Sequence, residues 1–271
     1  MKMIVVAVVA VILASMLLLV GCDGQGLNYL GIYKKVSEDE VSSVRKMIAD
    51  GLFTASFSYK VTKNLETREF NIEHGNEEIS ASENSFFEGS VECANENIVK
   101  TYQHYVADSR VSFKDGGAIY WSDSEWELRA DSDAAYLDLQ KGTINGVTVG
   151  KYLLKSLGAD PFGRKRYYAN SIVMMMINDD SCGIYRSGQK YKLEMELANP
   201  VGISGTNTVA YISTKNGKLQ SIKVIQTYEG EREYSGVMYY EKLRLESLLQ
   251  FGDYSVDIPD NTDEYVPVRL W

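Results

Sequence analysis

The sequence predicts an α+β fold, in which an antiparallel sheet is accompanied by a few helices. Two observations lead to this class. Residues 190–242 alternate apolar and polar side chains with the period of two that half-buried strands require. Residues 37–51 instead place apolar side chains at helical spacing, and residues 149–178 include further helix candidates.

The first helix is expected to begin at Ser37. Ser37 and Glu40 have the spacing of a capping box, in which the Ser37 hydroxyl accepts from the Glu40 amide and the Glu40 carboxylate reaches back. Apolar residues follow at positions 41, 44, 47 and 48, and Gly51 is expected to end the helix.

Short strands are expected next. Residues 54–61 alternate in polarity, and a turn at 63–64 leads to a second strand that contains Phe70 and Ile72. A tight hairpin is expected around Asp115 and Gly116, because an Asp-Gly pair adopts the positive φ angles of such a turn. The sequence does not place the strands of residues 86–108.

Two central segments separate these strands from the later ones. Residues 149–157 are a short helix candidate, ended by Gly158 and Pro161. Residues 164–178 fit a helix or a buried strand, and we favour the helix. Four consecutive antiparallel strands should follow, at 190–197, 208–214, 218–228 and 232–242, with turns at Asn216-Gly217 and Glu229-Gly230.

The N-terminal segment resembles the export signal of bacterial lipoproteins. An apolar run covers residues 4–20, and as a helix it would be roughly 25 Å long, against roughly 30 Å for a bilayer core. Leu19-Val20-Gly21-Cys22, which ends the run, resembles a lipobox at all four positions. The resemblance implies that residues 1–21 are removed and that Cys22 is lipidated, which places the chain on the extracytoplasmic face of a cell membrane. An uncleaved anchor is the alternative.

The mature chain is expected to contain a tether, residues 22–36, and a single sheet domain with covering helices, residues 37–271. Losing Lys2 changes the net charge from −9 to −10, a balance that opposes binding to nucleic acid. Cys93 and Cys182 could form one disulfide in an exported protein, or remain two buried free thiols.

No catalytic motif stands out in the sequence. His74 and His104 are the only histidines, and neither has the spacing of a metal site or of a nucleophile-base pair. Asp131, Asp133 and Asp138 lack the glycine and glutamate of a calcium loop, so we interpret them as an exposed loop. The sequence therefore predicts neither an enzyme nor a bound cofactor or metal.

The order of elements, with the closing segment Tyr254-Ser255-Val256-Asp257-Ile258-Pro259 and its Val-x-Ile-Pro pattern, resembles the periplasmic lipoprotein-carrier superfamily, which includes mycobacterial lipid-carrying lipoproteins. The resemblance covers about residues 37–260. It implies a curved antiparallel sheet, a half-barrel, that wraps a few helices and holds acyl chains in an apolar cavity.

Three functions remain open from the sequence. The first is a carrier that binds a lipid or acyl chain without catalysis. Flexible methionine and amphipathic tyrosine suit the lining of such a site. We expect these lining residues to be Tyr168, Met174, Met175, Met176, Tyr191, Tyr228 and Tyr239. The second is an envelope-assembly lipoprotein with a solid core that binds a protein partner, and the third is an envelope hydrolase that works through carboxylates.

Overall fold

The computed structural model describes residues 32–52, 55–71, 76–95, 97–113, 120–144, 147–155, 168–197, 206–234, 237–260 and 262–268. Several predictions therefore lie outside the described residues. They are the export segment and lipobox with Cys22, most of the expected tether, Ile72, His74 and the turn around Asp115 and Gly116.

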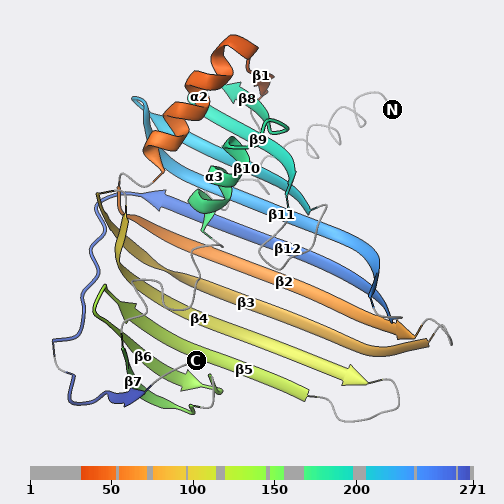
Figure 1. Cartoon of the computed structure of the whole chain (residues 1–271), viewed down its shortest axis with the longest axis vertical. Coiled ribbons are helices and arrows are strands. Elements are labelled where there is room, and N and C mark those ends of the chain that lie inside the picture. Colours follow the sequence, from red (N-terminus) through yellow and green to blue (C-terminus); the bar gives the residue numbers. More distant parts are fainter. Residues whose placement is uncertain are drawn as a thin grey trace, which may run out of the picture.

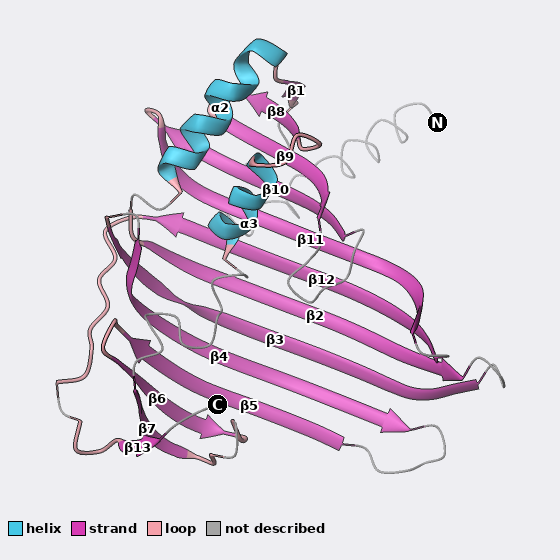
Figure 2. Ribbon diagram, viewed as in Figure 1, coloured by secondary structure: helices cyan, strands magenta, loops and turns pink. Residues whose placement is uncertain are grey.

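One sheet of thirteen strands makes up most of the described chain, and two helices lie on one of its faces (Figure 1, Figure 2). Strand neighbours are antiparallel except β13, which pairs in parallel with β7. The order across the sheet is β1-β8-β9-β10-β11-β12-β2-β3-β4-β5-β6-β7-β13.

In chain order the first elements are β1 (Lys34–Lys35), α2 (Glu38–Gly51), β2 (Phe57–Asn71), β3 (Asn76–Ala94), β4 (Asn97–Phe113), β5 (Tyr120–Ala130), β6 (Ala134–Lys141) and β7 (Gly150–Lys155). They are followed by α3 (Ala169–Ile177), β8 (Gly183–Ser187), β9 (Lys190–Leu197), β10 (Thr206–Lys215), β11 (Lys218–Tyr234), β12 (Val237–Phe251) and β13 (Val266–Val268).

The predicted α+β class was wrong. The described chain is nearly all β, and the sheet is open rather than a half-barrel around helices, because its order ends at β1 on one side and β13 on the other. One cause is the stretch of residues 86–108, whose strands the sequence did not place and which lies in two of the longest strands, β3 and β4. Their many polar residues are accommodated because each strand pairs along its length with two neighbours.

Helix α2 confirms the expected start and end, although its first turn differs in detail. Ser37 is the N-cap residue in an extended conformation, but its hydroxyl forms no hydrogen bond to a backbone amide of the helix. Instead it donates to the Glu40 carboxylate, 2.9 Å away. At the other end Gly51 is the last helical residue, and Leu52 keeps a right-handed conformation rather than a left-handed cap.

The later elements largely match the prediction. Helix α3 covers the ambiguous central segment, and β9, β10, β11 and β12 are consecutive antiparallel neighbours. Asn216 and Gly217, at the expected turn between β10 and β11, have φ angles of 52° and 74°. Both values are typical of a two-residue hairpin turn.

Three other local predictions were wrong. Residues 63–64 do not form a turn but lie inside β2, which continues without interruption to Asn71 and includes Phe70. Lys63 is buried there and forms an ion pair with Glu83 at 2.7 Å. Glu229 and Gly230 lie inside β11 rather than at a turn. The expected helix at 149–157 is replaced by strand β7, because its backbone pairs with β6 on one side and β13 on the other.

The two faces of the sheet differ in character. On the inner face, alternate residues pack against α2 and α3 in one core, whose largest members include Phe57, Tyr59, Ile172 and Leu193. A smaller core lies on β5, β6 and β7, and Tyr105 connects the two by packing against both Phe87 and Trp126. The outer face carries polar side chains and ion pairs such as Lys60–Glu88 and Lys223–Glu246.

Candidate functional site

Three of the predicted ligand-binding residues are part of the solid core. Tyr168 and Met176 are fully buried, and the Tyr168 ring centroid lies 4.6 Å from that of Tyr59. Tyr191 is also buried, on the inner face of β9, with the Arg186 guanidinium 5.7 Å from its ring centroid. These side chains support the packing of α3 on the sheet.

The other four do not form one cluster. Met174 packs at the edge of the core, and Met175 points away from it, with 44% of its surface exposed. Tyr228 and Tyr239 are half-buried on β11 and β12, opposite Leu243 and Arg232 respectively. The structure therefore does not bring the seven predicted residues together at one site.

Cys93 and Cys182 are free thiols in the structure, which corresponds to the second of the two alternatives. Cys182 is buried, and burial raises the pKa of its thiol to about 11. The thiol therefore stays protonated at neutral pH and is a poor nucleophile.

The larger of two grooves, the helix groove, lies between α2, the start of β11 and the end of β12. Its volume is about 800 Å³, and its lining consists of Ser43, Lys46, Met47, Asp50, Gly51, Ala55, Gly217, Lys218, Leu219, Gln220, Phe251, Gly252 and Asp253. Four of these residues, at positions 43, 46, 47 and 50, have the spacing of one helix face.

The helix groove has an apolar floor and a charged rim. Met47, Leu219 and Phe251 form the floor, and all three also contribute to the main core. At the rim, Lys46 and Asp50 form an ion pair of 3.0 Å on exposed positions. The walls are close together at Gly51, because a Cβ atom there would lie 2.8 Å from Cγ of Leu219.

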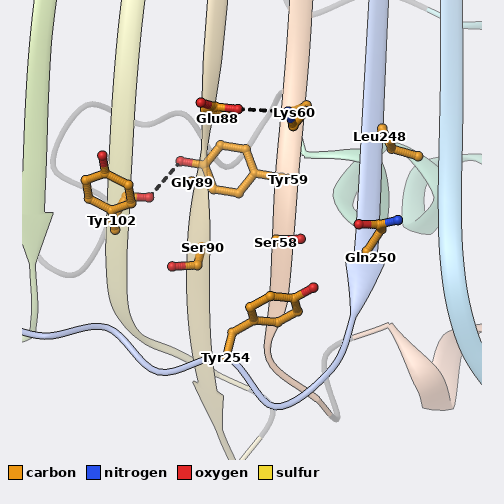
Figure 3. Close-up of a pocket in the computed structure, with 10 residues that line it drawn as sticks. All are labelled: Ser58, Tyr59, Lys60, Glu88, Gly89, Ser90, Tyr102, Leu248, Gln250 and Tyr254. Atoms are coloured by element: carbon orange, nitrogen blue, oxygen red, sulfur yellow. Dashed lines mark hydrogen bonds and ion pairs between the residues drawn. The ribbon is translucent and has the colours of Figure 1, made fainter.

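The second groove, the tyrosine groove, lies on the outer face of the sheet (Figure 3). Its volume is about 310 Å³, and it is lined by Ser58, Tyr59, Lys60, Glu88, Gly89, Ser90, Tyr102, Leu248, Gln250 and Tyr254. Four of its residues stand in one row across four strands, because Gln250 pairs with Ser58, Ser58 with Ser90, and Ser90 with Tyr102.

The orientation of Tyr102 is set by its neighbours on β5. The Arg129 guanidinium lies 4.8 Å from the ring centroid, and Arg129 also forms an ion pair of 3.4 Å with Glu127. Burial, followed by the negative charge of Glu127, raises the pKa of Tyr102 above its ordinary value. The phenol is therefore neutral at physiological pH and can act as both donor and acceptor.

Tyr254 reaches the same groove from the segment after β12, which passes the ends of β2 and β3 (Figure 3). The segment is held on both sides of the tyrosine. Before it, the Gly252 amide donates to the Ser56 carbonyl at 3.0 Å. After it, Val256 is buried and its amide donates to the Glu92 carboxylate at 3.3 Å.

Sequence reasoning missed the key residues of both grooves. Met47 was recognised only as part of a helical pattern, and Tyr254 only as part of the closing segment. Tyr102 lies in the stretch where the strands were left open. The alternation of residues 101–106 could have indicated a strand, but Tyr102 and Tyr105 put an aromatic ring on each side of it.

The described residues contain no group of three or more His, Cys, Asp or Glu side chains that could hold a metal ion. Asp131, at the turn between β5 and β6, instead accepts hydrogen bonds from the amides of Asp133 and Ala134, at 2.8 and 2.9 Å. Neither described helix has the length and apolar composition needed to cross a membrane.

Comparisons with known proteins assign no family. No family model matches the sequence, and no curated protein matches it either. Among solved structures, Pseudomonas aeruginosa OccK2 (OpdF) in complex with glucuronate is 7% identical with a TM-score of 0.19, and the match covers 74% of this chain and 62% of that one.

The enduracididine biosynthesis enzyme MppR, complexed with a condensation product of pyruvate and imidazole 4-carboxaldehyde, is 6% identical with a TM-score of 0.13. That match covers 74% of this chain and 89% of MppR. Likenesses at these TM-scores do not establish a shared fold, and no functional argument follows from them.

Proposed function

We propose that this protein is an extracytoplasmic lipoprotein, tethered to a cell membrane through Cys22, that binds an acyl chain of a lipid in the helix groove without catalysis. The proposal has two parts, and each is supported separately. The tether is supported by the sequence of residues 1–22, and the ligand by the groove.

Export and lipidation are supported by the apolar run at residues 4–20 and by Leu19-Val20-Gly21-Cys22 at its end. The polar, glycine-containing stretch at residues 23–28 suits a flexible connection between a lipid anchor and a folded body. A protein held in this way would meet lipids at short range.

The observation that carries the ligand proposal is the size and lining of the helix groove. Its volume of about 800 Å³ falls within the range of roughly 300–1,000 Å³ for small-molecule sites. Met47, Leu219 and Phe251 provide an apolar floor, and the unbranched methionine can adjust to chains of different shape. Each methylene group buried there contributes about 0.8 kcal/mol.

The rim suits the polar end of the same ligand. Lys218 places an ammonium group beside the apolar floor, where it could meet a carboxylate or phosphate of a lipid, whereas Lys46 is paired with Asp50. Asp50 and Asp253 stand at the same rim, so the groove as a whole carries both signs of charge. This balance favours an amphipathic lipid with its acyl chain on the floor and its head group in solvent.

The test uses the chain from Asp23 onward, which lacks the anchor and retains every described element. Titration with a fluorescent long-chain fatty acid should show saturable uptake at one site. Met47→Trp places a bulky ring on the groove floor, and we expect it to weaken binding about tenfold, which corresponds to about 1.4 kcal/mol.

Met175→Trp is the matched control, because it introduces the same side chain at an exposed position of α3 that lines neither groove. Its affinity for the fatty acid should equal that of the unmodified chain. Absence of saturable uptake, or equal loss of affinity in both variants, would contradict the proposal and favour a protein-binding lipoprotein with a solid core.

A further inference from the structure

The tyrosine groove is a second site, separate from the helix groove, and its lining has a different chemistry. The two grooves share no lining residue. The helix groove joins an apolar floor to charged rims, whereas the tyrosine groove combines the phenol rings of Tyr59, Tyr102 and Tyr254 with hydroxyl, amide, ammonium and carboxylate groups. It lies on the polar face of the sheet, opposite the face that α2 and α3 cover.

The floor of this groove is shallow because its residues are small. Ser58 and Ser90 pair directly across β2 and β3, and their hydroxyl groups face the outer side. Gly89, the residue before Ser90 on β3, also lines the groove and has no side chain. The space above the floor, about 310 Å³, lies at the lower end of the range for ligand sites, roughly 300–1,000 Å³.

Two of the three rings, those of Tyr102 and Tyr254, are held in position before any ligand arrives. Arg129 and Glu127 fix Tyr102, and the hydrogen bonds of Gly252 and Val256 fix the segment of Tyr254. Figure 3 shows the two rings at different edges of the groove, with Ser90 between them. Preorganised rings lose little conformational entropy on binding, so even a few weak contacts can add up to measurable affinity.

The charged side chains that line the tyrosine groove neutralise each other. Lys60 and Glu88 form an ion pair of 3.1 Å, and among the described residues no other lysine, arginine, aspartate or glutamate lines the groove. A charged ligand would have to compete with one member of this pair. The site is therefore matched to an uncharged ligand.

We propose that the tyrosine groove binds a neutral saccharide of one or two rings. A pyranose ring has an apolar face of C–H groups, which packs on an aromatic ring such as Tyr102 or Tyr254. Its hydroxyl groups both donate and accept, as do Ser58, Ser90 and the Gln250 amide. Lys60 supplies further donors and Glu88 further acceptors. An acyl chain offers no hydrogen bonds to these groups.

The test uses the full-length protein in a detergent without a sugar head group. The probes are glucose, N-acetylglucosamine, cellobiose and chitobiose, measured by saturation-transfer NMR and by calorimetric titration. We expect saturable binding of at least one probe. Tyr254→Ala should weaken it about tenfold, because this substitution removes one ring without altering a sheet strand.

Two further variants keep the result interpretable. Ser90→Leu places a larger side chain on the groove floor from β3. It should weaken binding of the same probe, even if Tyr254→Ala disturbs the segment after β12. Tyr240→Ala is the control, since Tyr240 is a tyrosine on β12 that does not line the groove, and it should bind as the unmodified protein does. Thermal unfolding of each variant verifies that it is folded.

Binding of no probe, or equal binding by the unmodified protein and the folded Tyr254→Ala and Ser90→Leu variants, would overturn the saccharide proposal. The result is separable from the fatty-acid test. Met47→Trp should leave saccharide binding unchanged, and Tyr254→Ala should leave fatty-acid binding unchanged. Loss of fatty-acid binding in Tyr254→Ala, with no saccharide bound, would instead place the lipid in the tyrosine groove and overturn the saccharide assignment.

Discussion

The Tyr59 hydroxyl donates a hydrogen bond to the backbone carbonyl oxygen of Tyr102, 3.1 Å away and two strands across the sheet. The strand between them contributes Gly89, which pairs directly with Tyr59. Because glycine has no side chain, the Tyr59 ring can cross β3 and reach β4. A core residue of the inner face thus holds the strand that presents Tyr102 on the outer face.

Gly89→Ala should destabilise the protein by about 1–3 kcal/mol, the usual cost of overpacking. The new Cβ atom would lie 1.9 Å from the Tyr102 carbonyl oxygen and 2.9 Å from the Tyr59 hydroxyl, so β4 or the ring must move. Denaturant unfolding measures the change. Ser90→Ala, at the next residue, should have a much smaller effect, and equal stability of the two variants would be evidence against this close approach.

Asn216→Val should destabilise the protein by roughly 1 kcal/mol, because a β-branched residue resists a positive φ angle. The φ angle of Asn216 is 52°. Asn216→Gly is the control and should be close to neutral, since glycine adopts this conformation freely. The midpoints of urea unfolding distinguish the two outcomes, and an unchanged midpoint for valine would argue against a tight turn at this position.

Cys182 should make stability fall at alkaline pH. Burial raises the pKa of its folded thiol from 9.0 to about 11, so the folded state retains a proton that the unfolded state releases. The contribution is therefore fully present below pH 9 and is lost as the pH rises toward about 11. In Cys182→Ala this part of the decrease should disappear, whereas Cys93→Ala should retain it. Unfolding free energies between pH 8 and 11, the span of this titration, provide the measurement.

Cys22→Ala should abolish attachment to the membrane, because a lipidated cysteine supplies anchoring of about 0.8 kcal/mol for each buried methylene group. Membrane fractionation and mass spectrometry of the N-terminal peptide test this. If the variant remains in the membrane through an uncleaved helix of residues 4–20, the lipoprotein proposal fails.

Local patterns were sufficient to predict α2, to favour a helix at α3, and to predict the antiparallel order of β9 to β12, although the turn between β11 and β12 was wrongly placed at Glu229-Gly230. A helix face at positions 41, 44, 47 and 48, or the Asn216-Gly217 turn, depends on residues that are close in sequence. The same reasoning failed at residues 63–64 and 149–157. There the outcome depends on pairing with distant strands, such as that of Lys63 with Leu245 and of Tyr152 with Val266.

The candidate sites could not be predicted from the sequence, for a related reason. Tyr102 and Tyr254 lie more than half the chain apart, and only the strand order and the path of the segment after β12 bring them to one groove. Tyr168 and Met176 have residue types that suit a ligand site, yet packing against the sheet makes them core. Residue type alone cannot distinguish a core residue from a ligand-binding residue, because both roles bury the same apolar surface.

By itself, the sequence determined the elements that short-range periodicity and turn chemistry specify, together with the lipobox pattern on which the proposed tether rests. Only the tertiary structure decided that one open sheet replaces the α+β arrangement, and that Met47 and Leu219, or Tyr102 and Tyr254, share a groove. The physical reason is that a strand is stabilised by its neighbours across the sheet, and these neighbours can come from anywhere in the chain.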